Sequence, residues 1–264
     1  MKIPIYQIDA FTNEQFKGNP AAVCPLEEWI PDEIMQKIAA ENNLSETAFF
    51  VQKGHEYELR WFTPAREVDL CGHATLATAF VVFTYLDPAA AQIQFHTKSG
   101  VLEVSRDGSL LSMVFPALEG EKCGAPKALI RGLGKVPKEV YKSRDYLAVF
   151  ETEQDILGLS PDMEELKKLD SFGVIVTAKG SEADFVSRLF APKDGIDEDP
   201  VTGSAHCTLV PYWKKVLKKN EFTALQLSER GGKLYCMDLG DKVKISGKAV
   251  PYLEGNICIS YFGS

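Results

Sequence analysis

The sequence lacks the closely spaced cysteine pairs that hold metal ions or form redox disulfides. Its six cysteines are at positions 24, 71, 123, 207, 236 and 258, and no two have CxxC spacing. The four histidines are equally scattered. A zinc ribbon is therefore not expected, and we predict no metal site. Isolated cysteines are typical of proteins from a reducing cytosol, so we expect a cytoplasmic protein.

Positive charge and long apolar runs are also scarce. The net charge is −8 and the isoelectric point is about 5.2, which argues against nucleic acid or an anionic membrane as a partner. The longest apolar run, residues 74–86, is too short to span a bilayer. The first residues, MKIPIYQIDAF, enter a strand pattern without an apolar signal segment. We therefore expect neither nucleic-acid binding nor membrane insertion.

The motifs that bind nucleotides are absent as well. The chain has no Walker A loop, no GxGxxG after a predicted strand and no GxSxG turn. We therefore expect no nucleotide or flavin, and we predict that the protein uses no cofactor. What the chain does have is a core: 45% of its 264 residues are hydrophobic, enough for one large domain or two of moderate size.

Two glycine turns, each opening an apolar helix, are the most distinctive feature of the sequence. Gly72 precedes the apolar residues 74–86, and Gly203 lies in the segment EDPVTGSAHCTLVPYW. A helix that is apolar on every side must be buried. The free amides of a helix N-terminus favour an anion, and glycine lets a ligand approach the backbone. We therefore expect a small-molecule carboxylate as the ligand.

The two halves of the sequence resemble one another. Residues 60–64, RWFTP, correspond to RLFAP 128 residues later, and the two glycine turns are 131 residues apart. A slowly drifting offset is expected from an old duplication with small loop insertions. We predict two domains, 1–118 and 119–264, in which the last residues can return to the first domain. The segment 119–137, rich in Gly, Pro and Lys, is the predicted linker.

Four polar residues form a candidate proton-transfer set. Glu46 has Ser171 as its counterpart in the second half, so one half alone supplies this acid. Asp199 comes only from the other half, five residues before Ser204, and His73 follows the first glycine. An acid or base, a second acid, an imidazole and a hydroxyl can together move protons. We predict that these four side chains are catalytic.

Cys71 suggests a competing mechanism, which the sequence disfavours. A thiol at a helix N-terminus can have a lowered pKa, and racemases that use two bases place a second thiol opposite the first. The corresponding position in the second half holds Thr202. We therefore interpret Cys71 as a buried structural cysteine.

Six motifs of this chain resemble those of the PhzF-like family, named after an isomerase of phenazine biosynthesis. They occur in family order over nearly the whole chain: DAFT at 9–12, FKGNPAAV at 16–23, LSETAF at 44–49, RWFTP at 60–64, CGHATLA at 71–77 and EDPVTGSAH at 198–206. Each motif is weak alone, and together they are specific.

The resemblance implies an α+β fold of the diaminopimelate-epimerase type. In that fold two similar antiparallel β-barrel domains each surround a central helix, with the active site in the cleft between them. It implies that Glu46 moves the proton, with His73, Asp199 and Ser204 around the substrate. It also implies that Gly72 and Gly203 contact the ligand and that Asn19 binds its polar end. Relatives of this kind are often dimers, so a homodimer is possible.

The predicted function is thus a cofactor-independent isomerase that moves a proton on a small carboxylated metabolite, cyclic compounds included. Two alternatives stay open at this point. One is a dehydratase or epimerase of a related amino or hydroxy acid. The other is a non-catalytic module that keeps the fold and binds a metabolite or another protein.

Overall fold

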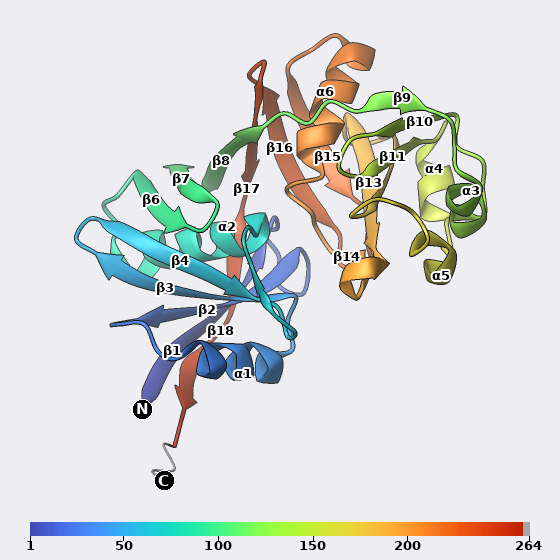
Figure 1. Cartoon of the computed structure of the whole chain (residues 1–264). Helices are drawn as coiled ribbons and strands as arrows, with labels where there is room; N and C mark the ends of the chain where they lie inside the picture. Colours follow the sequence, from blue (N-terminus) through green and yellow to red (C-terminus); the bar gives the residue numbers. More distant parts are fainter. Residues whose placement is uncertain (261–264) are drawn as a thin grey trace. The chain divides into compact units, whose positions relative to one another are not determined.

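The computed structural model of the chain describes residues 1–260 (Figure 1). Contacts between residues divide the molecule into two compact units. Unit 1 comprises Met1–Met113 and the segment from Ser246 onward, and unit 2 comprises Val114–Ile245. The chain enters unit 2 within strand β8 (Leu110–Pro116) and leaves it within β17 (Lys242–Gly247). The C-terminal strand therefore belongs to the N-terminal unit.

Unit 1 is a mixed sheet with two helices. Its helices are α1 (Asp32–Asn42) and α2 (Gly72–Val81), and α2 continues into a π-helical turn, η1 (Val82–Leu86). Its remaining strands are β1 (Lys2–Ala10), β2 (Asn19–Leu26), β3 (Glu46–Lys53), β4 (Glu56–Phe62), β5 (Glu67–Val68), β6 (Gln92–Thr97), β7 (Gly100–Asp107) and β18 (Ala249–Cys258).

Helix α1 covers one face of this sheet. Its acidic first turn complements the helix dipole, and it ends at Asn43, which adopts a left-handed conformation with φ of 49°. Its buried side chains, Met35, Ile38 and Ala39, pack in one cluster with Cys24 of β2 and Phe49 of β3. Because side chains alternate across a strand, Ala21 and Glu46 point to the opposite face.

Helix α2 is buried on nearly every side, as the sequence predicts. Its threonines are satisfied within the helix: Thr75 donates to the carbonyl of Cys71 at 2.5 Å, and Thr78 donates to that of Ala74 at 2.7 Å. These bonds remove the cost of burying two hydroxyls among apolar side chains. The helix can therefore occupy the core of unit 1 while its N-terminus remains beside the start of β3.

Unit 2 likewise consists of a mixed sheet and several helices. Its strands besides the two shared ones are β9 (Glu121–Cys123), β10 (Glu139–Lys142), β11 (Tyr146–Val149), β12 (Val174–Lys179), β13 (Phe185–Ala191), β14 (Ile196–Asp199), β15 (Glu221–Gln226) and β16 (Gly232–Asp238). Its helices are α3 (Lys127–Leu133), α4 (Glu153–Leu157), α5 (Met163–Leu166), the short 3₁₀ turn η2 (Pro192–Asp194) and α6 (His206–Leu217).

Strand pairing follows the same order in the two units. In unit 1, β2 is parallel to β3, β3 antiparallel to β4, β4 parallel to β6 and β6 antiparallel to β7. In unit 2, β11, β12, β13, β15 and β16 repeat this series of parallel and antiparallel pairs. The sequence predicts antiparallel strands only, whereas each unit also has parallel pairs. A helical connection such as α1, between β2 and β3, allows the second strand to run in the same direction as the first.

The two arginines that align in the sequence also make the same contacts. Arg60 binds Glu67 through Nε and Nη2 at 2.7 and 2.9 Å, and Arg188 binds Glu198 through the same atoms at the same distances. Each guanidinium also lies over a phenylalanine two residues further along its strand. A shared pairing order and a shared ion pair support the duplication, which stays a prediction.

Unit 2 differs from expectation at its smaller helices. The predicted linker 119–137 contains strand β9 and helix α3, because Leu129 and Leu133 are apolar enough to be buried in the core of unit 2. Helix α5 is a single turn, and Asp162 caps it by accepting from the N–H groups of Glu164 and Glu165. Helix α4 was not predicted. Across residues 1–260, none of the helices has the length and apolarity that a membrane span requires.

Gly18, which leads into β2, is predicted to be irreplaceable. Its φ is +67°, and a Cβ there would lie 2.2 Å from the carbonyl oxygen of Ala10. Gly54 has nearly the same φ, +66°, but open space around it. Gly54→Ala should cost about 1–2 kcal/mol of unfolding free energy for the backbone conformation alone. Gly18→Ala should cost about 1–3 kcal/mol more from the clash. Equal losses in urea denaturation would contradict this account.

Candidate active site

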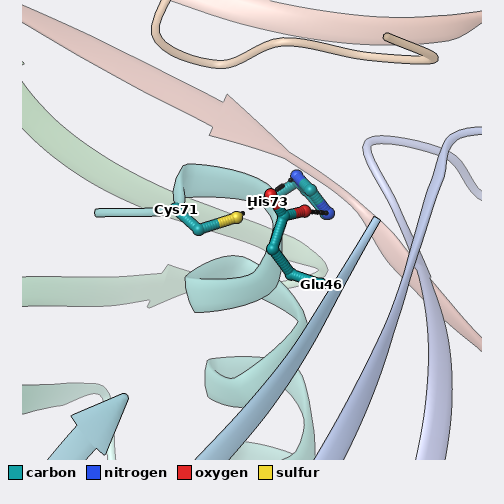
Figure 2. A group of neighbouring side chains, drawn as sticks. All are labelled: Glu46, Cys71 and His73. Atoms are coloured by element: carbon teal, nitrogen blue, oxygen red, sulfur yellow. Dashed lines mark hydrogen bonds and ion pairs between the residues drawn. The ribbon is translucent and has the colours of Figure 1, made fainter. Parts of the chain in front are cut away.

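Glu46 and His73 meet inside unit 1 (Figure 2). The imidazole Nε2 of His73 lies 3.1 Å from Oε2 of Glu46. Both side chains are largely buried, with 12% of the Glu46 side chain and 7% of the His73 side chain exposed. The structure thus brings together two of the four predicted catalytic residues.

Two elements set this geometry. Glu46 is the first residue of β3, where it pairs with Ala21 of β2, and His73 is the second residue of α2. The first turn of α2 lies beside the start of β3, since it carries the imidazole that reaches Glu46. Because β3 and α2 begin at the same place, they hold the Glu46 and His73 side chains together.

The approach of the two side chains is close but not aligned as a hydrogen bond. Neither Oε2 of Glu46 nor Nε2 of His73 has an aligned partner among the described residues, although both atoms are buried. Buried polar atoms are usually satisfied, and exceptions gather at functional sites. Catalytic hydrogen bonds are often poorly aligned before the substrate binds. Both atoms therefore retain bonding capacity for a ligand.

Cys71 contacts the other side of the His73 ring. Its Sγ lies 3.5 Å from Nδ1, and Figure 2 shows the Cys71 and Glu46 side chains both turned toward the imidazole. Burial, together with the charge of Glu46, raises the pKa of the Cys71 thiol to about 11. At neutral pH the thiol therefore keeps its proton, contrary to the thiolate that a two-thiol racemase needs.

The proton affinity of His73 reflects opposing effects. Burial alone lowers its pKa, but the contacts with Cys71 and Glu46 raise the pKa well above 6.5. Because the Cys71 thiol is uncharged at neutral pH, the carboxylate of Glu46 is the charge that favours the imidazolium. The pair is therefore best described as a carboxylate beside a protonated or strongly basic imidazole.

Glu46, Cys71 and His73 are also the residues whose donor atoms could approach one metal ion. One donor atom from each lies within 4.8 Å of the others, among the residues that the structure describes. The closest contacts, however, use different ring nitrogens: Nε2 faces Glu46 and Nδ1 faces Cys71. A single ion would bind one nitrogen only, so this arrangement suits a hydrogen-bonded chain better than convergent ligands.

Asn19 and Gly72 border the same end of unit 1. Asn19 is the first residue of β2 and fully buried. It lies two residues before Ala21, so its side chain shares the sheet face of Glu46. Gly72 opens α2, and a Cβ at this position would meet nothing within 4 Å. Packing therefore does not require glycine at residue 72, which is consistent with a ligand approaching the helix amides.

In unit 2, Asp199 belongs to a polar network around Thr202. The hydroxyl of Thr202 donates to Oδ2 of Asp199, and the backbone N–H of Thr202 donates to Oε1 of Gln226 at 2.8 Å. The Gln226 amide in turn donates to the carbonyl oxygen of Asp199 at 2.8 Å. The position that corresponds to Cys71 thus holds a hydroxyl fixed on a carboxylate.

Ser204 lies beside Arg144 in the same unit. Nη2 of Arg144 donates to Oγ of Ser204 at 3.3 Å, and the guanidinium binds the buried carboxylate of Asp145 through Nε and Nη2. It also lies over the ring of Phe172. These contacts fix the guanidinium while 40% of the Arg144 side chain stays exposed, as a site for an anion would require.

Gly203 is buried in the turn before α6, and its carbonyl accepts from the N–H of His206 at 3.0 Å. Sequence reasoning assigned no role to Arg144, to Gln226 or to His206. The motif KSRDYL around Arg144 contains charged residues before a strand, which is too common a pattern to indicate a site.

Comparison with known proteins identifies the family to which the chain belongs. The family model "PhzC-PhzF: Phenazine biosynthesis-like protein" matches residues 8–255, and the chain belongs to this family. An uncharacterised isomerase of Pseudomonas aeruginosa is 52% identical over 257 residues, covering 97% of this chain and 99% of the relative. The family resemblance seen in the sequence is thereby confirmed.

Solved structures of other proteins share the fold of this chain. A PhzF-family protein of Enterococcus faecalis has a TM-score of 0.96 at 48% identity, covering 98% of this chain and 100% of that one. A hydroxyproline epimerase of Agrobacterium vitis, 10% identical, has a TM-score of 0.60 and covers 97% of this chain and 92% of that one. The second likeness concerns the fold alone, and it confirms the α+β class of the epimerase type.

His206 should make the stability of the protein depend on pH. Burial lowers its pKa to about 4, against 6.5 in the unfolded chain, so the unfolded state binds the extra proton as pH falls below 6.5. The stability present above pH 6.5 is therefore lost between pH 6.5 and 4, at about 1.4 kcal/mol per pH unit for one group. His206→Asn keeps a donor near the carbonyl of Thr202 and should lose less stability from pH 7 to 5.

Urea denaturation of both proteins at the two pH values measures this difference. A loss about 2 kcal/mol smaller in His206→Asn is the expected result. The same pH dependence in both proteins would show that His206 titrates normally in the folded state.

Proposed function

We propose that this protein is a cofactor-independent isomerase that moves a proton between two carbons of a small carboxylated metabolite. The contact between Glu46 and His73 carries the proposal. A carboxylate acceptor and a basic imidazole, both buried and both with bonding capacity left, form a proton-transfer pair. Membership of the isomerase family adds support.

Glu46 acts as the base in this proposal. Its carboxylate accepts a proton from a carbon adjacent to an electron-withdrawing group, and the C–H electron pair enters the conjugated system of the substrate. The same oxygen then returns the proton to another carbon, where a new C–H bond forms as the double bond moves. The sum of the two steps is neutral in protons and electrons, so no external reagent is needed.

His73 supports both steps from beside the carboxylate. Its Nε2 lies 3.1 Å from Oε2 of Glu46, so the imidazole is next to the oxygen that accepts the proton. It can also stabilise negative charge that develops on the substrate. The carbanion formed in the first step gains from this donor in a way that the starting compound, which has no charge on that carbon, does not.

The proposed substrate class is a carboxylic acid. In unit 1 the open space at Gly72 leads to the first amides of α2, which lack acceptors within their own helix. In unit 2 the proposed binding residue is Gly203, beside the oriented guanidinium of Arg144, and Asp199 and Ser204 stay proposed catalytic residues. Both units thus offer donors that suit carboxylate oxygens.

A two-thiol epimerase is the weaker candidate. Burial holds the Cys71 thiol protonated with a pKa of about 11, and the corresponding residue in unit 2 is Thr202. A threonine hydroxyl fixed on Asp199 is too weak an acid and base to replace a thiolate. Epimerisation through Glu46 itself would instead produce solvent exchange at one carbon without movement of a double bond.

Hydrogen exchange tests the proposal without a known substrate. Small unsaturated carboxylic acids and their methyl esters are incubated in D₂O with the full-length protein, and NMR follows deuterium at each carbon and the position of the double bond. We expect acids, not esters, to exchange, with deuterium appearing at the carbon to which the proton is returned. Glu46→Gln should reduce the rate at least about 100-fold, as removal of a general base does.

The chain contains a matched control. Glu56 also contacts a histidine, His96, at 2.7 Å in unit 1, but about half of each side chain is exposed. Glu56→Gln should leave exchange unchanged. Full exchange in Glu46→Gln would remove Glu46 as the base, and exchange without double-bond movement would favour an epimerase.

A further inference from the structure

We propose that the thiol of Cys71 is a positioning group for His73, which keeps the proton-bearing Nε2 directed at Glu46 in every protonation state of the ring. The importance of this arrangement for catalysis rests on the proposed function. The arrangement itself is a property of the resting protein, and it can be tested without any substrate.

The geometry divides the two ring nitrogens between two partners. Nδ1 lies 3.5 Å from Sγ of Cys71, a hydrogen-bond distance for sulfur, and Nε2 lies 3.1 Å from Oε2 of Glu46. All three side chains are held by the junction of β3 and α2, and Cys71 is only 6% exposed. His73 therefore bridges a thiol and a carboxylate.

A protonated thiol can bond Nδ1 in either state of the ring. When the imidazole is neutral, S–H can donate to the lone pair of Nδ1, which favours the tautomer with the hydrogen on Nε2 and avoids a second lone pair beside the Glu46 carboxylate. When the ring is an imidazolium, Nδ1–H donates to the sulfur. The thiol is available for both because it is protonated at neutral pH. In both states Nε2, the ring nitrogen nearer Glu46, carries a hydrogen.

His206 shows what a different partner does. Its Nδ1 lies 2.9 Å from the carbonyl oxygen of Thr202, which can only accept, so the hydrogen must be on Nδ1. The two buried histidines at the starts of α2 and α6 are thus expected to hold opposite tautomers. A carbonyl in place of the Cys71 thiol would direct a lone pair of His73 at Glu46 whenever the ring is neutral.

The consequence concerns where protons move. The proton that His73 gains or loses is the one on Nδ1, away from Glu46. Oε2 of Glu46 therefore always faces a donor and remains an acceptor until it takes a proton from the substrate. Without the thiol, the neutral ring could adopt the other tautomer, in which Nε2 and Oε2 face each other as two acceptors unless Glu46 is protonated.

The test is ¹⁵N NMR of the full-length protein with labelled histidine. Long-range correlations distinguish the two tautomers, and substitution of each of the four histidines assigns the signals. We expect neutral His73 to carry its hydrogen on Nε2 and His206 to carry it on Nδ1. Cys71→Ala should convert His73 to a mixture of tautomers and leave His206 unchanged. Cys71→Ser, which keeps a group able to donate and accept, should retain the Nε2–H form.

Two results would overturn the proposal: an Nδ1–H tautomer of His73 in the unsubstituted protein, or an unchanged tautomer in Cys71→Ala. If His73 stays protonated over the whole stable pH range, the same spectra decide. The proposal then requires that Cys71→Ala shifts the Nδ1 resonance of His73 much more than the Nε2 resonance, and the reverse pattern overturns it. The ¹H–¹⁵N backbone spectrum verifies that each variant is folded.

An activity measurement separates positioning from catalysis. On any acid that exchanges, Cys71→Ala should lower kcat for exchange about 10-fold with little change in KM, and Cys71→Ser should restore most of it. If Glu46 proves not to be the base, the tautomer result still stands on its own. If the tautomer result fails while Glu46→Gln still abolishes exchange, only the role of Cys71 is lost.

Discussion

The contact of Glu46 with His73 is the constraint on which the rest of unit 1 depends. A carboxylate that is this deeply buried needs a donor, and an imidazole beside it is stabilised in its protonated form. Strand β3 must therefore begin where α2 begins, and α2 packs against both β2 and β3. The two threonine hydroxyls of α2 permit this packing, because each donates to a backbone carbonyl one turn earlier and so is not left unpaired in the core.

The two units use one structural plan with different chemistry at the equivalent turn. In unit 1 the turn carries a thiol and an imidazole next to a carboxylate, and in unit 2 it carries a hydroxyl fixed on Asp199 and a serine next to Arg144. Shared strand order and shared arginine–glutamate pairs indicate that the framework can remain while these few side chains diverge. One framework thus holds a carboxylate–imidazole contact in one unit and a serine–guanidinium contact in the other.

The main helices and the family could be predicted from the sequence. The contacts of the site and the short helices could not, because they depend on tertiary packing. The apolar helices, the glycine turns and the motifs around Glu46 and His73 have local patterns, so α2, α6 and the family followed from them. The contact between Glu46 and Nε2, however, depends on the register of β2 with β3, which joins residues far apart in the chain. Helices α3 and α4 are short, and burial of side chains such as Leu129 and Ile156 stabilises them rather than a strong sequence period. The orientation of Arg144 also needs tertiary contacts, because its guanidinium lies over Phe172 and the N–H of Gly173 donates to its partner Asp145.

The central claim, that Glu46 and His73 interact as one buried pair, is tested most directly by a double-mutant cycle. Unfolding free energies of the protein, Glu46→Gln, His73→Gln and the double variant at neutral pH give the coupling between the two side chains. The account predicts a favourable coupling of about 1–3 kcal/mol, as expected for two groups in direct contact. Additive effects of the two substitutions, with a coupling near zero, would contradict it.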